Sequence, residues 1–538
     1  MPGFLGSKTL LLPPFFSAPY FLPTMTELEL LRRESLQKLR DLGIDPYPAE
    51  SFEVTAQAAD IVAHYQEEVM EDGSKNRLNY QEVALAGRVM ASREAGKALF
   101  MNLQDASGRI QLYLRRDDFL TGESAEAPLF DIAIKKLLDL GDYVGVRGFA
   151  FKTKTGEVSV HVREFKMLSK SLRSLPVVKK DADGNVYDAF TDPEQRYRRR
   201  YVDLTVNTEF RDIFRKRTQL IKTIRAYLDE LGLMEVETPI LQPIHGGAAA
   251  RPFKTHHNAL DMPLYLRIAN ELYLKRLIVS GFDGVYEIGK MFRNEGMDRT
   301  HNPEFTMLEY YVAYKDYFWL MQATEQMLER IARALHPSGD STAQVGEHTL
   351  QFAGPYRQMS LYDAIREHTG LDAEAADETA LRRYCRDEHI EIDATMGKAK
   401  LLDEIFSAKA EKHLIQPTFL MDHPVEMSPL TKKHRSKPGL VERFELFVNG
   451  KEVANAYSEL NDPIDQRERF EEQLRLAARG DKEAMAMDED FLRALEYGMP
   501  PTAGIGFGID RLTMLFTNQT SIQEVLFFPQ MRPEKTGE

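Results

Sequence analysis

The feature that most constrains the fold is a series of strand-length apolar segments between residues 82 and 170. The segments read VALAGRVMASR, ALFMNLQDASGRIQLYLRR, DYVGVRG and TGEVSVHVREFKML, with glycine-containing turns between them. Their apolar residues alternate or run together over the length of a strand, and one helical segment, FDIAIKKLLDLG, interrupts them. Residues 81–172 are therefore predicted to form a small barrel of five short strands with one helix.

This pattern is typical of an oligonucleotide-binding (OB) barrel, whose open face binds single strands. Phe100 and Gln111 lie on strands that would form this face, Arg93 precedes a turn, and Glu157 lies in a basic hairpin. An aromatic ring for stacking, beside polar groups for base edges, is what recognition of single-stranded RNA needs. We therefore predict an RNA-binding surface at these residues. The alternative is that Phe100 belongs to the barrel core.

The length of the chain sets the rest of the domain organisation. At 538 residues it is too long for one ordinary core, so at least two domains are expected. Residues 1–24 lack acidic side chains, and prolines interrupt their apolar run, which argues against a signal peptide. The expected order is a disordered extension at 1–24, a helical segment at 25–80, the barrel at 81–172, a linker at 173–210, and a large domain at 211–538 with a helical insertion at about 315–415.

Charge and cysteine content exclude several classes of protein. The formal net charge of −14 argues against indiscriminate nucleic-acid binding, but basic clusters at 151–180 and 196–201 (RYRRRY) predict a polyanionic partner. The single cysteine, Cys385, excludes an internal disulfide and a zinc site of several thiolates, and it fits a reducing cytoplasm. No apolar run reaches membrane-spanning length, so we expect a cytoplasmic protein without membrane contact.

A polar stretch at 292–305, FRNEGMDRTHNPEF, lies between two segments that have the pattern of buried strands. Arg293 and Glu295 share one face of an extended chain, because strand side chains alternate with period two. Phe305 ends the stretch, and Glu309 follows inside an apolar run, where a carboxylate is costly to bury unless it is paired or functional. The stretch predicts a site for a ligand with both charges and a flat ring. The alternative is a solvated hairpin loop.

Several motifs resemble those of one enzyme family. MEVETPIL, FRNEGMDRTHNPEFTMLE and GIGFGIDR resemble the three motifs of class II aminoacyl-tRNA synthetases, and GGAAARPF, NELYLKRL, HNPEFTMLEYY and SELNDP resemble the bacterial lysyl branch. The resemblance runs from about residue 25 to 530. It implies an α+β chain with an N-terminal OB-fold anticodon-binding barrel and a catalytic domain, whose antiparallel sheet of six to seven strands is flanked by helices. It also implies a homodimer paired through the first motif, with ATP, L-lysine and tRNA(Lys) as substrates.

The implied reaction is attack of an amino-acid carboxylate on the α-phosphate of ATP. The carboxylate is already ionised at neutral pH, so the reaction needs charge neutralisation and positioning rather than a general base. By resemblance Arg293 and Arg511 are the catalytic pair. The remaining implied ATP contacts are Glu295 at the adenine amino group, His301 at the far phosphates, Phe305 under the adenine, and Asn302 and Asn455 at polar positions nearby.

Glu445 and Glu452 are predicted to bind Mg²⁺ beside the ATP. They lie on two strands of a hairpin joined at Asn449 and Gly450, which brings both carboxylates to one site. Oxygen ligands and a phosphate substrate favour Mg²⁺ over zinc. The alternative is an exposed acidic pair.

Substrate choice is predicted to rest on a set of carboxylates that repel one another unless a cationic ligand enters. The resemblance assigns Glu459 and Tyr311 to the side-chain ammonium of lysine. Ala454 and Ala456 flank Asn455 where some family members have glycines, so their methyl groups are expected to narrow the pocket floor. The remaining implied lysine contacts are Glu271 and the Gly247 carbonyl at the α-amino group, Glu309 between the two ammonium groups, and Arg293 at the carboxylate.

Three alternatives remain on sequence grounds. An aspartyl- or asparaginyl-tRNA synthetase shares the barrel and the motifs, but the predicted pocket carboxylates argue against an acidic substrate. A lysyltransferase that acts on elongation factor P resembles the catalytic domain alone, and the barrel argues against it. A non-catalytic RNA-binding relative is disfavoured by the intact set of candidate site residues.

Overall fold

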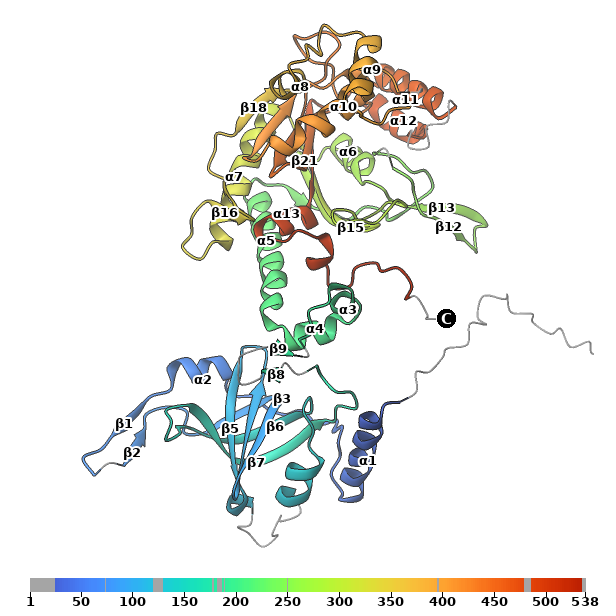
Figure 1. The fold of residues 1–538 in the computed structure, drawn as a ribbon. Helices are drawn as coiled ribbons and strands as arrows, with labels where there is room; N and C mark the ends of the chain where they lie inside the picture. The colour runs from blue at the N-terminus through green and yellow to red at the C-terminus, as the bar shows by residue number, and fades with distance from the viewer. Residues whose placement is uncertain are drawn as a thin grey trace, which may run out of the picture. The chain divides into compact units, whose positions relative to one another are not determined.

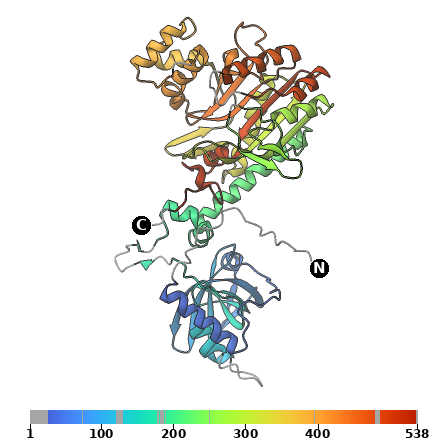
Figure 2. The same cartoon turned by 90° about the vertical axis from the view of Figure 1, so that its right-hand side faces the viewer.

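Contacts in the computed structural model divide the chain into two units, Met1–Ala189 and Phe190–Glu538. Figure 1 shows the elements of each unit, and Figure 2 shows the same ribbon turned by 90°. The extension expected at 1–24 and part of the expected linker lie outside the described residues. The structure describes residues 25–72, 74–119, 129–176, 179–180, 186–187, 189–248, 250–393, 396–478 and 485–534.

A closed barrel of five strands forms the first unit, in the order β3-β4-β5-β7-β6, which confirms the prediction. The last strand in this order, β6, pairs with β3 and closes the barrel. On β4, Leu99, Met101 and Leu103 point into the core, and the residues between them point outward. The strands are β3 (Val83–Ala95), β4 (Ala98–Gln104), β5 (Arg109–Arg115), β6 (Tyr143–Lys152) and β7 (Val158–Ser169).

The expected helix between β5 and β6 is present as a π-helix, η3 (Leu129–Leu137). An N-terminal helix begins at a capping box formed by Thr26 and Glu29. Its buried Arg32 donates hydrogen bonds to the carbonyls of Leu140, Ser171 and Arg173, which attaches the helix to the barrel. The other elements of this unit are α1 (Glu27–Asp41), α2 (Ala58–His64), β1 (Glu67–Val69), β2 (Lys75–Arg77), the short 3-10 helix η2 (Arg116–Phe119), β8 (Lys179–Lys180) and β9 (Val186–Tyr187).

The second unit is built on an eight-stranded sheet in the order β10-β14-β15-β22-β21-β20-β19-β18. Its inner pairs are antiparallel, and the two edge pairs, β10–β14 and β18–β19, are parallel. The resemblance implied six to seven strands, and the sheet of the structure has eight. The strands are β10 (Met234–Glu235), β14 (Gly284–Phe292), β15 (Glu304–Ala313), β22 (Thr502–Gly508), β21 (Lys451–Ser458), β20 (Arg443–Val448), β19 (Thr418–Met421) and β18 (Arg357–Ser360).

Smaller strands and a set of helices surround the sheet. The smaller strands are β11 (Leu241–Gln242), β12 (Lys254–His257), β13 (Met262–Leu266), β16 (Thr342–Val345) and β17 (His348–Gln351). The helices are α3 (Pro193–Arg198), α4 (Arg200–Val206), α5 (Arg211–Glu230), α6 (Glu271–Val279), α7 (Tyr317–Leu335), α8 (Leu361–Thr369), α9 (Glu378–Asp387), α10 (Lys398–Lys409), α11 (Pro463–Ala478), α12 (Glu489–Glu496) and α13 (Ile509–Phe516). None of the described helices has the length and apolarity needed to cross a membrane.

Helices α5, α7 and α13 pack on one face of the sheet and form the main core with it, as Leu220, Leu320 and Leu512 show. Helices α8, α9 and α10 have a core of their own around Leu381 and Leu401, and they form a yellow-to-orange group beside the sheet in Figure 2. The helical insertion is thus narrower than expected, because α7 belongs to the main core and β18 to the sheet.

The cluster RYRRRY at 196–201 does not form an exposed basic surface. Arg196 and Arg200 are buried, and each forms an ion pair with buried Asp203. Arg196 also binds Glu524 at 3.0 Å, which joins α3 and α4 to the C-terminal segment of the same unit. The cluster therefore presents less free positive charge than its sequence indicates, because tertiary ion pairs neutralise two of its arginines.

Candidate active site

The polar stretch at 292–305 connects β14 to β15 and forms one wall of the site. Phe305 lies on β15 opposite Met291. The Arg293 guanidinium lies 5.1 Å from the Phe305 ring centroid, and its buried Nε has no hydrogen-bond partner among the described residues. Glu295 Oε1 accepts a hydrogen bond from the backbone N–H of Arg251 at 3.2 Å. An arginine with an unpaired nitrogen above an aromatic ring suits an anionic ligand that carries a flat base.

Arg511 and His301 meet at the other side of this stretch. Arg511 lies in the first turn of α13, the helix after β22, and its Nη2 donates to His301 Nε2 at 3.2 Å. Its Nη1 donates to the Glu452 carbonyl oxygen at 2.9 Å. His301 Nδ1 is held by Asp298 at 2.8 Å. The predicted residues Arg511, His301 and Glu452 are therefore brought together from three separate parts of the sequence.

Asn302 is occupied by contacts within the protein. Its Nδ2 donates to the carbonyl of Glu304 at 2.6 Å, and its Oδ1 accepts from the backbone N–H of Gln530 at 3.3 Å. The Asn302 amide therefore fixes the loop against the C-terminal segment in this structure.

The hairpin of β20 and β21 carries the two predicted metal ligands. Asn449 and Gly450 adopt the positive φ values of 53° and 66° that a tight hairpin turn requires. Past this turn a β-bulge shifts the register, so that Asn455 rather than Ala454 lies opposite Glu445. Because the bulge reverses the alternation, Asn455 points to the same face as Glu445 and Glu452.

The electrostatics of this carboxylate pair fit a divalent cation. Burial raises the pKa of Glu445, and burial together with the Glu445 charge raises the pKa of Glu452. Arg443 contacts Glu445 and donates to Asn455 Oδ1 at 3.1 Å. Among the described residues no group of three His, Cys, Asp or Glu side chains could hold a metal ion. The two carboxylates of the hairpin fit Mg²⁺, which takes one or two carboxylates and completes its shell with phosphate and water oxygens.

Three buried carboxylates form the floor of the site, on α6, on β15 and just after β21: Glu271, Glu309 and Glu459 are 5 %, 4 % and 2 % exposed. Burial raises the pKa of Glu309 to about 8, and repulsion from Glu271 adds to the shift. Tyr311 Oη donates to Glu309 Oε2 at 2.9 Å, so Glu309 orients Tyr311 in this structure.

A protein cation already lies among these carboxylates, which sequence reasoning missed. Lys275 is fully buried, and its Nζ lies 2.5 Å from Glu271 Oε1 and contacts Glu459. Burial lowers the pKa of Lys275, but the two carboxylates outweigh it and the net shift is upward. Tyr457 Oη donates to Glu271 at 2.7 Å and was missed as well. Two features of the sequence could have identified these residues. Lys275 lies four residues after Glu271, the spacing of paired side chains on a helix, and Tyr457 lies two residues before Glu459.

Two glycines allow these side chains to approach closely. Gly247 has a φ of 84°, and a Cβ there would lie 3.3 Å from the Glu271 Cβ. A Cβ at Gly504 would overlap both Glu459 Oε1 and the Tyr311 ring. Gly506 and Gly508 on the same strand are less crowded, because an added Cβ would meet its nearest atoms at 3.0 Å and 3.6 Å.

Ala454 and Ala456 do not narrow the pocket floor. Both are buried in the main core on the opposite face of the sheet from Asn455. The expectation was wrong because strand alternation places the flanking methyl groups away from the site.

Comparisons with known proteins decide the family. A family described as tRNA synthetases class II (D, K and N) matches residues 192–532, and one described as OB-fold nucleic acid binding domain matches residues 83–168. A lysine–tRNA ligase of Porphyromonas gingivalis is 60% identical over 513 residues, or 95% of this chain and 87% of the relative. The chain belongs to the class II lysine–tRNA ligases. Further members of that name are 57% identical in Christiangramia forsetii, over 96% of this chain and 88% of the relative, and 56% identical in Azobacteroides pseudotrichonymphae, over 95% and 99%.

In this lysine–tRNA ligase family member, the outer face of the barrel carries the predicted RNA-binding residues. Phe100 points outward from β4 and is half-buried, so it is not a core residue. The Arg93 guanidinium lies 4.6 Å from the Phe100 ring centroid. Gln111 is buried on β5, and its Oε1 has no hydrogen-bond partner among the described residues. Glu157 is exposed in the turn before β7.

The same face extends further than predicted. Tyr113 lies 5.0 Å from Phe100 and 5.1 Å from His161, measured between ring centroids. Phe149 continues the series at 4.9 Å from His161. Tyr113 could have been found from the sequence, because it lies two residues after Gln111 on the same strand face.

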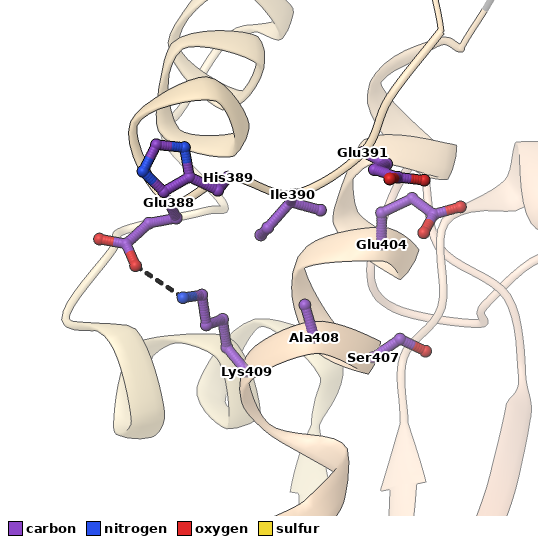
Figure 3. Close-up of a pocket in the computed structure, with 8 residues that line it drawn as sticks. All are labelled: Glu388, His389, Ile390, Glu391, Glu404, Ser407, Ala408 and Lys409. Atoms are coloured by element: carbon purple, nitrogen blue, oxygen red, sulfur yellow. Dashed lines mark hydrogen bonds and ion pairs between the residues drawn. The ribbon is translucent and has the colours of Figure 1, made fainter.

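A separate cavity of about 420 Å³ lies between the end of α9 and α10. Figure 3 shows its lining, in which Glu388 forms an ion pair with Lys409 at 2.6 Å. None of the candidate site residues of this lysine–tRNA ligase family member lines it, so it is distinct from the candidate active site.

Proposed function

We propose that the protein joins L-lysine to tRNA(Lys) in two steps. A lysine carboxylate oxygen attacks the α-phosphorus of ATP, the bond to the bridging oxygen of the β-phosphate breaks, and pyrophosphate leaves with the electron pair. A hydroxyl at the 3′ end of the tRNA then attacks the adenylate carbonyl, loses its proton, and displaces AMP. The observation that carries the proposal is a buried carboxylate pocket, Glu271, Glu309 and Glu459, in the same site as Arg293.

Arg293 is assigned to neutralising charge as the first step proceeds. Its planar guanidinium can bind the lysine carboxylate and an α-phosphate oxygen together. Burial lowers the pKa of Arg293, while Glu295, Glu452 and Glu309 oppose the shift. The group is therefore held in a poorly hydrated site, where its attraction for an anion is stronger than in water.

The nucleotide is assigned to the space between Phe305 and Arg511. Phe305 would stack on one face of the adenine ring, and the Arg511 guanidinium would lie over the other face in a cation–π contact. Glu295 would accept from the adenine amino group, and His301 would bind the far phosphates. Asn302 and Asn455 complete the polar surroundings.

Glu445 and Glu452 are assigned to Mg²⁺. When bound, the metal supplies positive charge to the phosphates. The protein's part is to hold both carboxylates on one face of the β20–β21 hairpin.

Selection of lysine follows from the charge of the pocket. Glu459 would bind the ε-ammonium, and Glu271 with the Gly247 carbonyl would bind the α-amino group. The description of the matched family also names D and N, the one-letter codes of aspartate and asparagine. An aspartate side chain would face buried carboxylates in this pocket and would be repelled by their charge. Lys275 is the cation observed beside Glu459, and it is already bound by Glu271 and Glu459.

The barrel is assigned to the anticodon of tRNA(Lys). Phe100 would stack on a base, Gln111 with its unpaired Oε1 would bind a base edge, and Arg93 and Glu157 would contact the flanking nucleotides. Each stacked base contributes ~1–3 kcal/mol.

The enzyme is further proposed to be a cytoplasmic homodimer. Met234, Ile240, Leu241 and Ile244 are apolar side chains that are 40–48% exposed, near the first motif. An apolar surface of this kind suits a two-fold interface between copies of the chain. Light scattering should give about twice the 61.6 kDa chain mass; a fully active monomer would contradict the proposal.

The deciding experiment is ATP–pyrophosphate exchange with each proteinogenic amino acid in turn. We expect exchange with lysine alone. Exchange with aspartate or asparagine would assign the protein to another branch. Binding of tRNA without exchange for any amino acid would identify a non-catalytic relative.

A further inference from the structure

Lys275 joins two carboxylates that come from distant parts of the sequence. It lies one helical turn after Glu271 on α6, and its Nζ contacts Glu459, which follows β21. Its side chain and that of Glu459 are fully inaccessible to solvent. The Tyr457 ring centroid lies 5.5 Å from Nζ and the Phe491 centroid 5.9 Å, at distances typical of cation–π contacts.

The two carboxylate oxygens of Glu459 differ in their contact with Lys275. Among the described residues neither oxygen has a hydrogen-bond partner, but Oε2 forms an ion pair with Lys275 and Oε1 does not. Oε1 points toward Gly504, where a Cβ would overlap it. Glu271, in contrast, is held by Lys275 and by Tyr457. The open acceptor of the pair is therefore on Glu459, where the ε-ammonium of lysine is proposed to bind.

The charges of the pocket explain why a resident cation is needed. Glu309 has a pKa raised to about 8, so it carries a proton at neutral pH. Burial raises the pKa of Glu459 well above its ordinary value, and contact with the Lys275 cation opposes this rise. Free lysine carries two ammonium groups and one carboxylate, a net charge of +1, which suits a pocket of carboxylates. Without Lys275, two adjacent buried anions would repel, and one of them would take up a proton.

We propose that Lys275 is a positioning residue for lysine selection: it holds Glu459 through Oε2, so that Oε1 is left for the substrate's side-chain ammonium. The inference rests on the proposed function. Lys275 itself touches neither ATP nor the reacting carboxylate in this assignment. Its loss should therefore weaken lysine binding and leave the chemical step intact.

The test is Lys275→Met, which keeps the length of the side chain and removes its charge. Loss of a cation in contact shifts a carboxylate pKa by ~1–3 units, so the KM for lysine in pyrophosphate exchange should rise about tenfold or more. The KM for ATP, and kcat at saturating lysine, should stay within about threefold, because the phosphate-binding residues are unaffected.

The matched control is Arg276→Met, the next residue on α6. Arg276 pairs with Asp488 at 2.8 Å and with Asp490 at 3.2 Å, neither of which is a pocket carboxylate, so the lysine KM of this variant should be normal. If Lys275→Met does not fold, Lys275→Gln keeps hydrogen bonding, loses the charge, and should show the same selective rise.

Two outcomes overturn the inference. A lysine KM within about twofold of wild type would show that Lys275 does not position Glu459. Parallel loss of lysine affinity, ATP affinity and thermal stability would show that its role is structural. Failure of the proposed function is distinguishable, because it would appear as absence of lysine-dependent exchange in the wild-type protein.

Discussion

Replacing Glu459 by Gln tests the proposed specificity site most directly. The side chain is fully inaccessible to solvent and Oε1 is unpartnered, so a bound lysine ammonium would form an ion pair closed from water. Removing one member of such a pair costs ~3–5 kcal/mol. At ~1.4 kcal/mol per factor of ten, kcat/KM for lysine should fall roughly 10²- to 10³-fold or more. Gln keeps the shape and an acceptor oxygen, and Lys275 keeps Glu271 as a partner at 2.5 Å, so the fold should survive.

The assay is lysine-dependent pyrophosphate exchange, with ATP binding measured on the same protein. Glu442→Gln is the matched control, because Glu442 is equally buried but pairs with Arg435 and Ser458. This control should lose stability and keep its lysine KM. Lysine activation in Glu459→Gln that persists within about tenfold would refute the reasoning, because a buried pair is worth more than that. Glu309 would then be the better candidate. Collapse of ATP binding would show that the Glu459 segment is structural.

Four other variants and measurements test the remaining parts of the site. Phe100→Ala should weaken tRNA charging by ~1–3 kcal/mol and spare pyrophosphate exchange; a parallel fall in both would contradict a role in RNA binding. Arg293→Lys should damage exchange itself, because a point charge cannot span phosphate and carboxylate together, and near-normal exchange would remove Arg293 from the mechanism. Gly504→Ala should raise the KM for lysine and leave ATP binding unchanged, because the alanine Cβ would displace the Glu459 side chain. An unchanged lysine KM would show that the Glu459 position does not depend on this glycine. Glu309 has a pKa of about 8 in the free protein, and a bound lysine cation should lower it. Calorimetry at neutral pH in buffers of different ionisation enthalpy should therefore show proton release that Glu309→Gln abolishes. Lysine binding should weaken by up to about tenfold per pH unit as the pH falls from about 8 to 6. Lysine binding that does not depend on pH would count against a place for Glu309 in the lysine pocket.

The sequence by itself determined the features that depend on local periodicity. Alternation in residues 82–170 predicted the barrel, and the same alternation places Phe100 on its outer face. The Asn449–Gly450 turn predicted that Glu445 and Glu452 share a site, because a tight turn fixes the pairing of the strands beside it. The three motifs that resemble those of class II synthetases identified which residues of the sequence belong to the candidate site.

Only the tertiary structure decided which charges neutralise one another. Glu271 and Tyr457 are 186 positions apart and in hydrogen-bond contact, and no local pattern predicts that α6 lies beside β21. The same holds for Arg196, whose charge is neutralised by Glu524, 328 positions away. Sequence periodicity reports which face of an element is buried, whereas the partner of a buried charge depends on which elements become neighbours. For that reason the helical spacing of Glu271 and Lys275 indicates a pair in the sequence, whereas the contact of Lys275 with Glu459 could not be predicted from it.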